Sequence, residues 1–259
     1  MKIGLGQLST VWENRDENKI KCENMIVEAE KAGVDLIVFP EMTLTGFSMN
    51  LKKVAEPGKE SSSVLFFKKM TRKYDVAIAF GYAVLGEVKA KNRLCVVVGG
   101  KVLLEYDKIH PFSFGQESEY FSGGCELARI TMDGVGFGAF ICYDLRFPEI
   151  FQASSKKNHA IIVIANWPKS REDHWRILLK ARAIENQCYI IGVNRTGTGD
   201  HIVYNGGSAI IDPNGIQITP ETSREELIIG DIDTSIVDDS REHFTTKKDR
   251  REKLYRELR

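Results

Sequence analysis

The chain has 259 residues, 42% hydrophobic and 28% charged, and its 36 basic residues balance its 36 acidic ones. This composition is typical of a globular protein, and a net charge of zero argues against a nucleic-acid partner. No apolar run approaches the roughly 20 residues that span a bilayer, and the N-terminus shows no signal-peptide pattern. The five cysteines suggest no disulfide framework, so we expect a cytoplasmic protein without a membrane partner.

Strand-like apolar runs alternate with amphipathic helical stretches along the whole chain. Strands are predicted at about 3–8, 34–39, 76–84, 94–98, 102–106, 127–131, 135–141, 160–164, 188–194, 207–211 and 226–232. Helices are predicted at about 15–32, 60–74, 148–157, 171–187 and 234–242. With no internal repeat, linker or low-complexity segment, we expect a single domain over residues 1–259 with an α/β fold, its helices packed outside a core of strands.

Local signals refine three of these elements. Ser61 to Ser63 offer a cap for the second helix, and Asp212 to Gly215 form a turn between two late strands. The charged run from Lys247 to Arg251 is expected to be solvated helix surface rather than a binding arm.

Cys142 follows an apolar strand and precedes Pro148, which marks the start of a helix. A thiol between the end of a strand and the N-terminus of a helix is favoured as thiolate, the strongest nucleophile among ordinary side chains. An isolated cysteine would more often be a buried core residue, so the interpretation depends on its neighbours.

Two other strands end in chemically active side chains. Residues 35–41 lead through Pro40 to Glu41, and residues 102–108 lead to Lys108. An acid, an amine and a thiol at strand ends converge only where neighbouring strands finish at one edge, which is where α/β sheets hold ligands.

In this order and context, these three residues resemble the Glu-Lys-Cys triad of the nitrilase superfamily of carbon–nitrogen hydrolases. The resemblance covers essentially the whole chain. It rests on Gly6-Gln7, Phe39-Pro40-Glu41, Tyr106-Asp107-Lys108, Cys142 to Pro148, Ala165 to Pro168, His174-Trp175 and Ala181 to Gln187. It implies a four-layer αββα sandwich and a homodimer that uses the charged C-terminus. No cofactor is implied, and no two of the five histidines sit at metal-ligand spacing.

The resemblance also implies roles. Glu41 would be the general base, and Lys108 would lower the pKa of the thiol and stabilise the oxyanion together with the backbone N–H of Tyr143. Members often carry a second glutamate seven residues before a glycine, and counting back from Gly124 selects Glu117 over Glu119. The alternative for each of Glu41, Lys108 and Glu117, taken singly, is an ordinary charged residue on the surface.

Arg146 lies four residues beyond the cysteine, and related carbamoylases use arginines just after their cysteine to bind a substrate carboxylate. The alternative is a structural ion pair of Arg146 with Asp144, Glu149 or another carboxylate. Asn166 and Trp167, in the Ala165 to Pro168 loop, are expected to bind substrate together with Tyr143.

Three residues of the next helix are expected to support the site from outside. Arg182 and Glu185 would form a structural ion pair beneath it. His174 would stand at the helix start or in the pocket wall rather than in a Cys-His dyad.

The residues after the cysteine separate the branches of this superfamily. True nitrilases show Trp-Glu there and carbamoylases show Asn-Asp-Arg-Arg, whereas this chain has Tyr143-Asp144. Among the remaining branches, the chain resembles the bacterial ω-amidases, which hydrolyse the terminal amide of 2-oxoglutaramate to ammonia and the acid. The alternatives are a deaminated-glutathione amidase and a catalytically silent member that binds a small carboxylated ligand.

Overall fold

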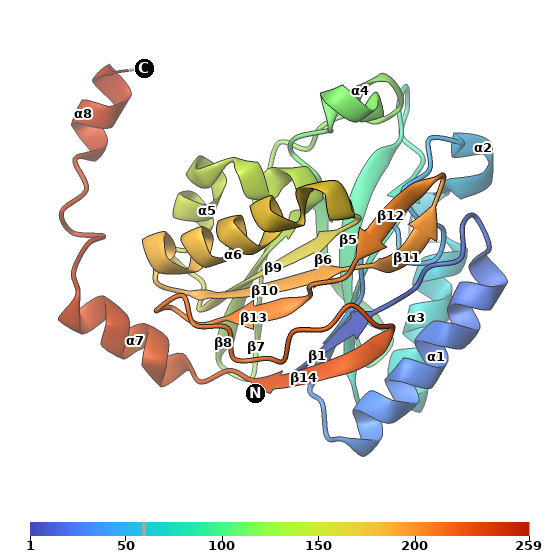
Figure 1. The fold of residues 1–259 in the computed structure, drawn as a ribbon, viewed down its shortest axis with the longest axis horizontal. Helices are drawn as coiled ribbons and strands as arrows, with labels where there is room; N and C mark the ends of the chain where they lie inside the picture. Colours follow the sequence, from blue (N-terminus) through green and yellow to red (C-terminus); the bar gives the residue numbers. More distant parts are fainter. Residues whose placement is uncertain (59–60, 259) are drawn as a thin grey trace.

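The computed structural model describes residues 1–58 and 61–258, and within them two β-sheets pack face to face (Figure 1). The larger, seven-stranded sheet has the order β14-β1-β2-β4-β5-β6, with β3 pairing beside β4. Its strands are β1 (Lys2–Gln7), β2 (Leu36–Val38), β3 (Ala55–Glu56), β4 (Ala77–Val84), β5 (Lys91–Val98), β6 (Lys101–Asp107) and β14 (Glu226–Asp231).

The second sheet has five strands in the order β13-β10-β9-β8-β7. They are β7 (Arg129–Met132), β8 (Val135–Ile141), β9 (Ala160–Ala165), β10 (Tyr189–Asn194) and β13 (Ala209–Ile211). Strands β8, β9 and β10 run parallel, and every residue of the three is buried, as expected of a sheet covered on both faces. A separate hairpin consists of β11 (Thr196–Gly199) and β12 (Ile202–Asn205).

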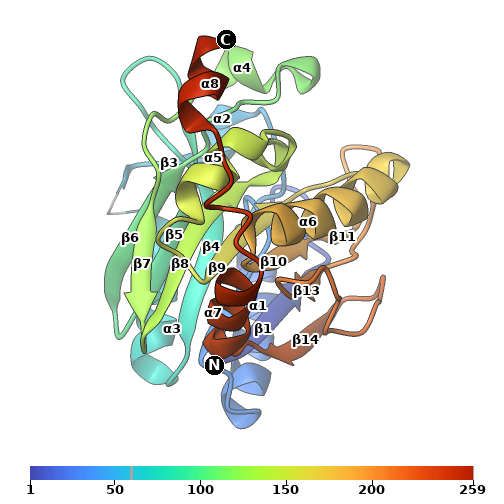
Figure 2. The ribbon, with the colours of Figure 1, turned by 90° about the vertical axis from the view of Figure 1, so that its left-hand side faces the viewer.

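Helices cover the outer face of each sheet (Figures 1 and 2). Helices α1 (Arg15–Lys31) and α3 (Ser62–Lys73) pack on the larger sheet, and α5 (Pro148–Ser154) and α6 (Glu172–Asn186) pack on the smaller one. The main hydrophobic core fills the space between the sheets and continues under α5 and α6. The predicted αββα sandwich is therefore confirmed.

Local signals account for several element boundaries. The Ser61 side chain accepts a hydrogen bond from the Val64 backbone at 3.0 Å and so caps α3; the start predicted at residue 60 lies outside the described residues. The turn at Asp212 to Gly215 is confirmed by a backbone hydrogen bond of 2.9 Å between its ends. The prediction missed β3, the glycine-rich β11–β12 hairpin and the short helices α2 (Leu51–Val54), α4 (Glu117–Tyr120) and α8 (Glu252–Glu257).

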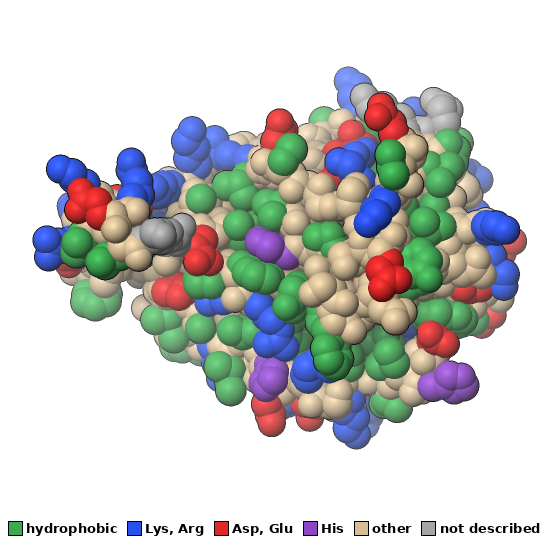
Figure 3. All heavy atoms as spheres, turned by 90° about the horizontal axis from the view of Figure 1, so that it is seen from above, with side chains coloured by type: hydrophobic (Ala, Val, Ile, Leu, Met, Phe, Trp, Pro, Cys, Tyr) green, Lys and Arg blue, Asp and Glu red, His purple; other side chains and the backbone are tan. Residues whose placement is uncertain are grey.

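The C-terminal segment follows α7 (Thr234–His243) and contacts α5, where Arg250 donates to Gln152 Oε1 at 2.5 Å. Its end stands out to one side of the main body (Figures 1 and 3), and Figure 2 views the molecule from that side. The prediction of a helix over the Lys247 to Arg251 run is wrong, because helix begins only at Glu252. Lys247 is half-buried and donates to the carbonyl of Ser155 at 3.1 Å, and burial lowers its pKa to about 8. In the described part of the chain, no helix has the length and apolarity to cross a membrane.

Candidate active site

Two glutamates and one lysine, from three different parts of the fold, meet in the interior. Glu41 follows β2, Lys108 follows β6, and Glu117 opens α4. The ammonium of Lys108 lies 3.1 Å from Glu41 Oε1 and 2.8 Å from Glu117 Oε2. All three side chains are at most 1% exposed, whereas Glu119 is exposed. The structure thus brings together three of the residues selected from the sequence.

Two asparagines hold the glutamates of this cluster. Asn92 Nδ2 donates to Glu41 Oε1 at 2.7 Å and to Glu117 Oε1 at 2.9 Å. The backbone N–H of Asn166 donates to Glu41 Oε2 at 2.8 Å, and its side chain donates to the Glu41 carbonyl at 2.6 Å. Asn166, predicted to bind substrate, therefore fixes the orientation of Glu41.

Cys142 stands directly after β8 and is half-buried. Its φ of +47° lies in the left-handed region, which is strained for a residue with a side chain and is often found at functional sites. It opens a 3₁₀ segment, Cys142–Arg146, and α5 begins only at Pro148. The strand end before Cys142 and the helix start at Pro148 are as predicted, and a 3₁₀ turn separates the thiol from the N-terminus of α5.

Asp144 explains how this turn is held. Its Oδ2 accepts from the Ile141 backbone at 3.1 Å and from the Tyr106 hydroxyl at 2.7 Å. Its Oδ1 accepts from the His110 backbone at 3.0 Å. These bonds join the loop of the nucleophile to the loop that follows Lys108. They also show that Asp144 is not the structural partner of Arg146.

The electrostatics of the thiol differ from expectation. Burial raises the pKa of Cys142 well above its ordinary value and the Glu41 carboxylate raises it further, while Lys108 only partly opposes these effects. The expected low-pKa thiolate is therefore wrong for the free protein. Two carboxylates around one ammonium leave an excess negative charge beside the sulfur, so the resting side chain is a thiol.

Lys108 is held in its charged form. Burial alone would lower its pKa, but the carboxylates of Glu117 and Glu41 outweigh burial and keep the pKa above its usual range. An amine that stays protonated cannot accept a proton from the thiol. Lys108 can instead stabilise a developing oxyanion.

A second group of residues, which we call the mouth, contains Phe112, Tyr143, Arg146, Trp167 and His174. The guanidinium of Arg146 lies 4.8 Å from the centre of the Trp167 ring, and its Nη2 is 3.2 Å from His174 Nδ1. The Tyr143 ring packs 4.9 Å from that of Phe112. Trp167 is only 3% exposed, so it supports Arg146 from below rather than offering open surface.

The expected support from α6 is present. Arg182 Nη1 pairs with Glu185 Oε1 at 2.9 Å, and Arg182 Nε donates to the Leu145 carbonyl at 3.1 Å. The ion pair predicted beneath the site is confirmed, and it is tied to the loop of the nucleophile. His174 lies in the first turn of the helix, as predicted, and it contacts Arg146.

Sequence reasoning missed Asn92, and it considered Asp144 only as a possible ion-pair partner of Arg146. A signal existed for Asn92: like the predicted site residues, it is a polar side chain at the edge of an apolar strand. No motif marked it, and an amide has no chemistry of its own to attract notice.

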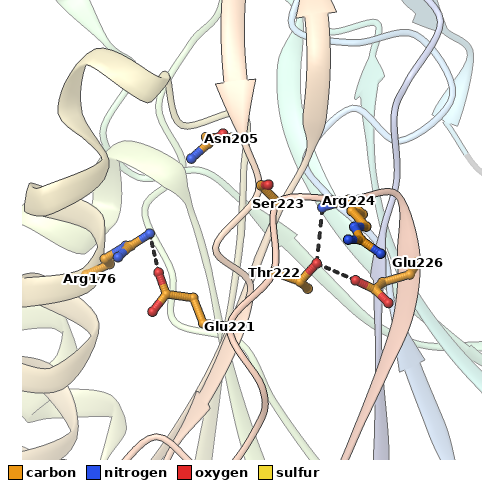
Figure 4. A pocket seen from close by; sticks show the side chains of 7 residues that line it. All are labelled: Arg176, Asn205, Glu221, Thr222, Ser223, Arg224 and Glu226. Carbon is orange, nitrogen blue, oxygen red and sulfur yellow. Dashed lines mark hydrogen bonds and ion pairs between the residues drawn. The ribbon is translucent and has the colours of Figure 1, made fainter.

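A separate pocket of about 470 Å³ lies between α6, β12 and the segment before β14 (Figure 4). Of its two arginines, Arg176 points to Glu221, and Thr222 forms a hydrogen bond with Glu226 (Figure 4). None of its lining residues belongs to the cluster around Lys108. Among the described residues, no group of three or more His, Cys, Asp or Glu is placed to hold a metal.

Comparison with known proteins gives concordant results. The carbon-nitrogen hydrolase family model matches residues 2–242. The 2-oxoglutaramate amidase of Bacillus subtilis (strain 168) is 36% identical over 93% of this chain and 94% of its own length. Omega-amidase YafV of Escherichia coli (strain K12) is 31% identical over 96% of both chains. The structure of XC1258 from Xanthomonas campestris, a CN-hydrolase superfamily protein with an arsenic adduct in the active site, superposes with a TM-score of 0.90 at 28% identity, covering 96% of this chain and 97% of that one.

Proposed function

Because the chain belongs to the carbon–nitrogen hydrolase family and acts on amides, we propose that it cleaves the terminal amide of a small carboxylated amide such as 2-oxoglutaramate. The products are ammonia and the acid, and the route is a cysteine acyl-enzyme. The observation that carries the proposal is the Lys108 ammonium held between Glu41 and Glu117, at the strand ends that also present Cys142.

Acylation begins from a thiol, since the pKa of Cys142 is raised. Glu41 takes the proton as the sulfur attacks the amide carbonyl, so thiolate forms only as it is consumed. The carbonyl oxygen becomes an oxyanion, which Lys108 and the backbone N–H of Tyr143 stabilise. Glu41 then passes the proton to the departing nitrogen, and ammonia leaves a thioester on Cys142.

In deacylation, Glu41 acts as a base again, this time toward water. Glu41 removes a proton from water, which attacks the thioester carbonyl, and the same two donors stabilise the second oxyanion. Collapse of this intermediate breaks the carbon–sulfur bond, releases the acid, and returns the proton to the sulfur. Glu117 holds Lys108 throughout and keeps it an ammonium.

The carboxylate of the substrate is assigned to Arg146. Its guanidinium is half-buried at the mouth and is flanked by Trp167 and His174. A planar fork with fixed charge suits a carboxylate. The relatives named as 2-oxoglutaramate amidase and omega-amidase support this choice of substrate class.

The test is ammonia release from a panel of 2-oxoglutaramate, deaminated glutathione, glutamine and a simple nitrile, with Cys142→Ala as the blank. We expect the highest kcat/KM for 2-oxoglutaramate and none for the nitrile. A clear preference for deaminated glutathione would replace the proposed substrate but keep the reaction. No turnover of any amide, with Cys142 intact, would indicate a ligand-binding member instead. Pairing of two copies stays a prediction, which light scattering checks.

A further inference from the structure

Like the ammonium of Lys108, the Nδ2 of Asn92 lies within hydrogen-bonding distance of both glutamates. The distances are 2.7 Å to Glu41 Oε1 and 2.9 Å to Glu117 Oε1. An amide nitrogen carries two hydrogens, so each glutamate receives one. Asn92 is 1% exposed, and water therefore does not compete for these bonds.

We propose that Asn92 is a positioning residue that keeps Glu41 and Glu117 ionised together, so that the one mobile proton of the cluster rests on Cys142. This inference rests on the proposed function, because the location of that proton decides whether Glu41 is free to act as a base.

The orientation of the Asn92 amide follows from its surroundings. Rotating the amide by half a turn would place its oxygen against two carboxylates, which repel it, so the nitrogen must face them. In this orientation Asn92 Oδ1 is buried, and it has no partner among the described residues. A buried acceptor without a partner is unfavourable, and such exceptions in native proteins call for an explanation. The two hydrogen bonds that Asn92 donates to the glutamates explain why its oxygen is left without a partner.

The charges show why a donor to both glutamates is needed. Two neighbouring carboxylates in a dry site ordinarily share a proton, because both cannot stay ionised without help. Lys108 supplies one positive charge between them, which leaves one negative charge uncompensated. Asn166 assists only Glu41, and the Phe112 backbone donates only to Glu117, at 2.6 Å. Besides Lys108, Asn92 is the donor among these that stabilises both ionised forms.

Other ionisable groups around the cluster have their own partners. On the strand of Asn92, Arg93 pairs with Asp107 at 2.6 Å. On the loop after Lys108, His110 pairs with Asp144 at 2.8 Å. Burial raises the pKa of Tyr204, which faces Glu41 and Cys142, to about 12, so it stays neutral in the range of interest. The acid limb of the pH profile therefore reports the carboxylate pair.

The experiment measures kcat/KM for 2-oxoglutaramate and the alkylation rate of Cys142 by iodoacetamide, both as functions of pH, in wild type and Asn92→Ala. Alkylation is quantified by mass spectrometry, with the exposed Cys125 as an internal reference. Losing two hydrogen bonds to the carboxylates disfavours the state in which both are ionised. We expect the acid limb of both profiles to move up by about one pH unit or more.

Two further variants keep the result interpretable. Asn92→Asp is nearly isosteric and serves if Asn92→Ala does not fold. The carboxyl group that Asn92→Asp introduces can donate at most one hydrogen bond. The acid limb of this variant should therefore move at least as far as that of Asn92→Ala. The matched control is Asn158→Ala, which removes a buried asparagine whose Nδ2 donates to the Ser154 carbonyl at 2.9 Å, away from the cluster. The acid limb of the pH profile of Asn158→Ala should coincide with that of wild type.

The outcomes are distinct. A uniform loss of rate in both Asn92 variants with an unmoved acid limb would overturn the inference, since only a structural role would remain. An equal shift in Asn158→Ala would overturn it as well. If wild type hydrolyses no amide but the acid limb of Cys142 alkylation still moves in Asn92→Ala, the proposed function fails and the role of Asn92 stands.

Discussion

The catalytic cluster and the mouth lie next to each other but are built by different rules. In the cluster, Glu41, Lys108 and Glu117 are buried, and each carboxylate oxygen accepts at least one hydrogen bond at 2.6–3.1 Å. In the mouth, Arg146 is half-buried and His174 is exposed, and one 3.2 Å contact and the face of a ring hold the guanidinium.

The difference separates two tasks. Groups that stabilise a transition state work best when they are fixed beforehand, because reorganising them would add to the barrier. Groups that select a substrate need only favour one ligand over another, so fewer and looser contacts suffice. Changes in the cluster should therefore slow every substrate alike, whereas changes in the mouth should alter the ranking of substrates.

The largest effect is expected from Cys142→Ala. Without the nucleophile the covalent route is lost, and amide hydrolysis should fall by at least ~10⁴ while the fold persists. Ammonia release measures the loss of activity, and circular dichroism of the same preparation shows whether the fold persists. Residual activity above about one per cent of wild type, in protein free of wild-type contamination, would contradict the assignment of the nucleophile.

Lys108→Ala and Glu41→Gln should be nearly as damaging. Removing the cation costs oxyanion stabilisation worth roughly 3–4 kcal/mol or more, and removing the carboxylate eliminates the base. Their effects on the thiol should be opposite: the first variant raises the pKa of Cys142 further and the second lowers it. The pH dependence of Cys142 alkylation measures this. The loss of activity in the double variant, expressed as a free energy, should be far smaller than the sum of the losses in the two single variants. Additive losses would mean that the two residues act on different steps.

Arg146→Ala tests the mouth. If the guanidinium binds the substrate carboxylate in a desolvated pocket, its loss should cost about 2–5 kcal/mol. That is roughly 30- to several-thousand-fold in kcat/KM for 2-oxoglutaramate, whereas a neutral short-chain amide should lose far less. Arg146→Lys keeps the charge but not the planar fork and should recover only part of the activity. Equal losses for both substrates would make Arg146 structural.

The same division explains what the sequence revealed. Glu41, Lys108 and Cys142 were recognisable because each follows the end of a predicted strand, and the pattern of such strands is readable without a structure. The αββα layers followed from the family resemblance; alternation alone indicated only an α/β fold. The hairpin Thr196–Gly199 with Ile202–Asn205 was missed because its first strand alternates threonine with glycine, which weakens the strand signal.

What stayed hidden depends on contacts between distant segments. The roles of Asn92 and Asp144 come from partners far away in the chain, such as Glu41 and Tyr106, so no local pattern encodes them. The pKa of Cys142 was misjudged for the same reason: local position suggested a thiolate, but burial and two carboxylates decide the balance. Local pattern thus located the reactive groups, and tertiary contacts determined their state.

The smallest effect is expected from His174→Ala, which leaves the cluster untouched. Arg146 Nη2 donates to His174 Nδ1 at 3.2 Å, an exposed contact that orients the guanidinium without binding substrate itself. A hydrogen bond of this kind contributes about 1 kcal/mol, which corresponds to roughly a fivefold loss in kcat/KM for 2-oxoglutaramate. A neutral amide, which has no use for Arg146, should be hydrolysed at the wild-type rate. His174→Gln retains an acceptor and should recover part of the loss. In Arg146→Ala, replacing His174 should have no further effect, because the group that it orients is gone. A loss of the same size for both amides, or one that persists without Arg146, would show that His174 acts through the first turn of α6 and not through the guanidinium.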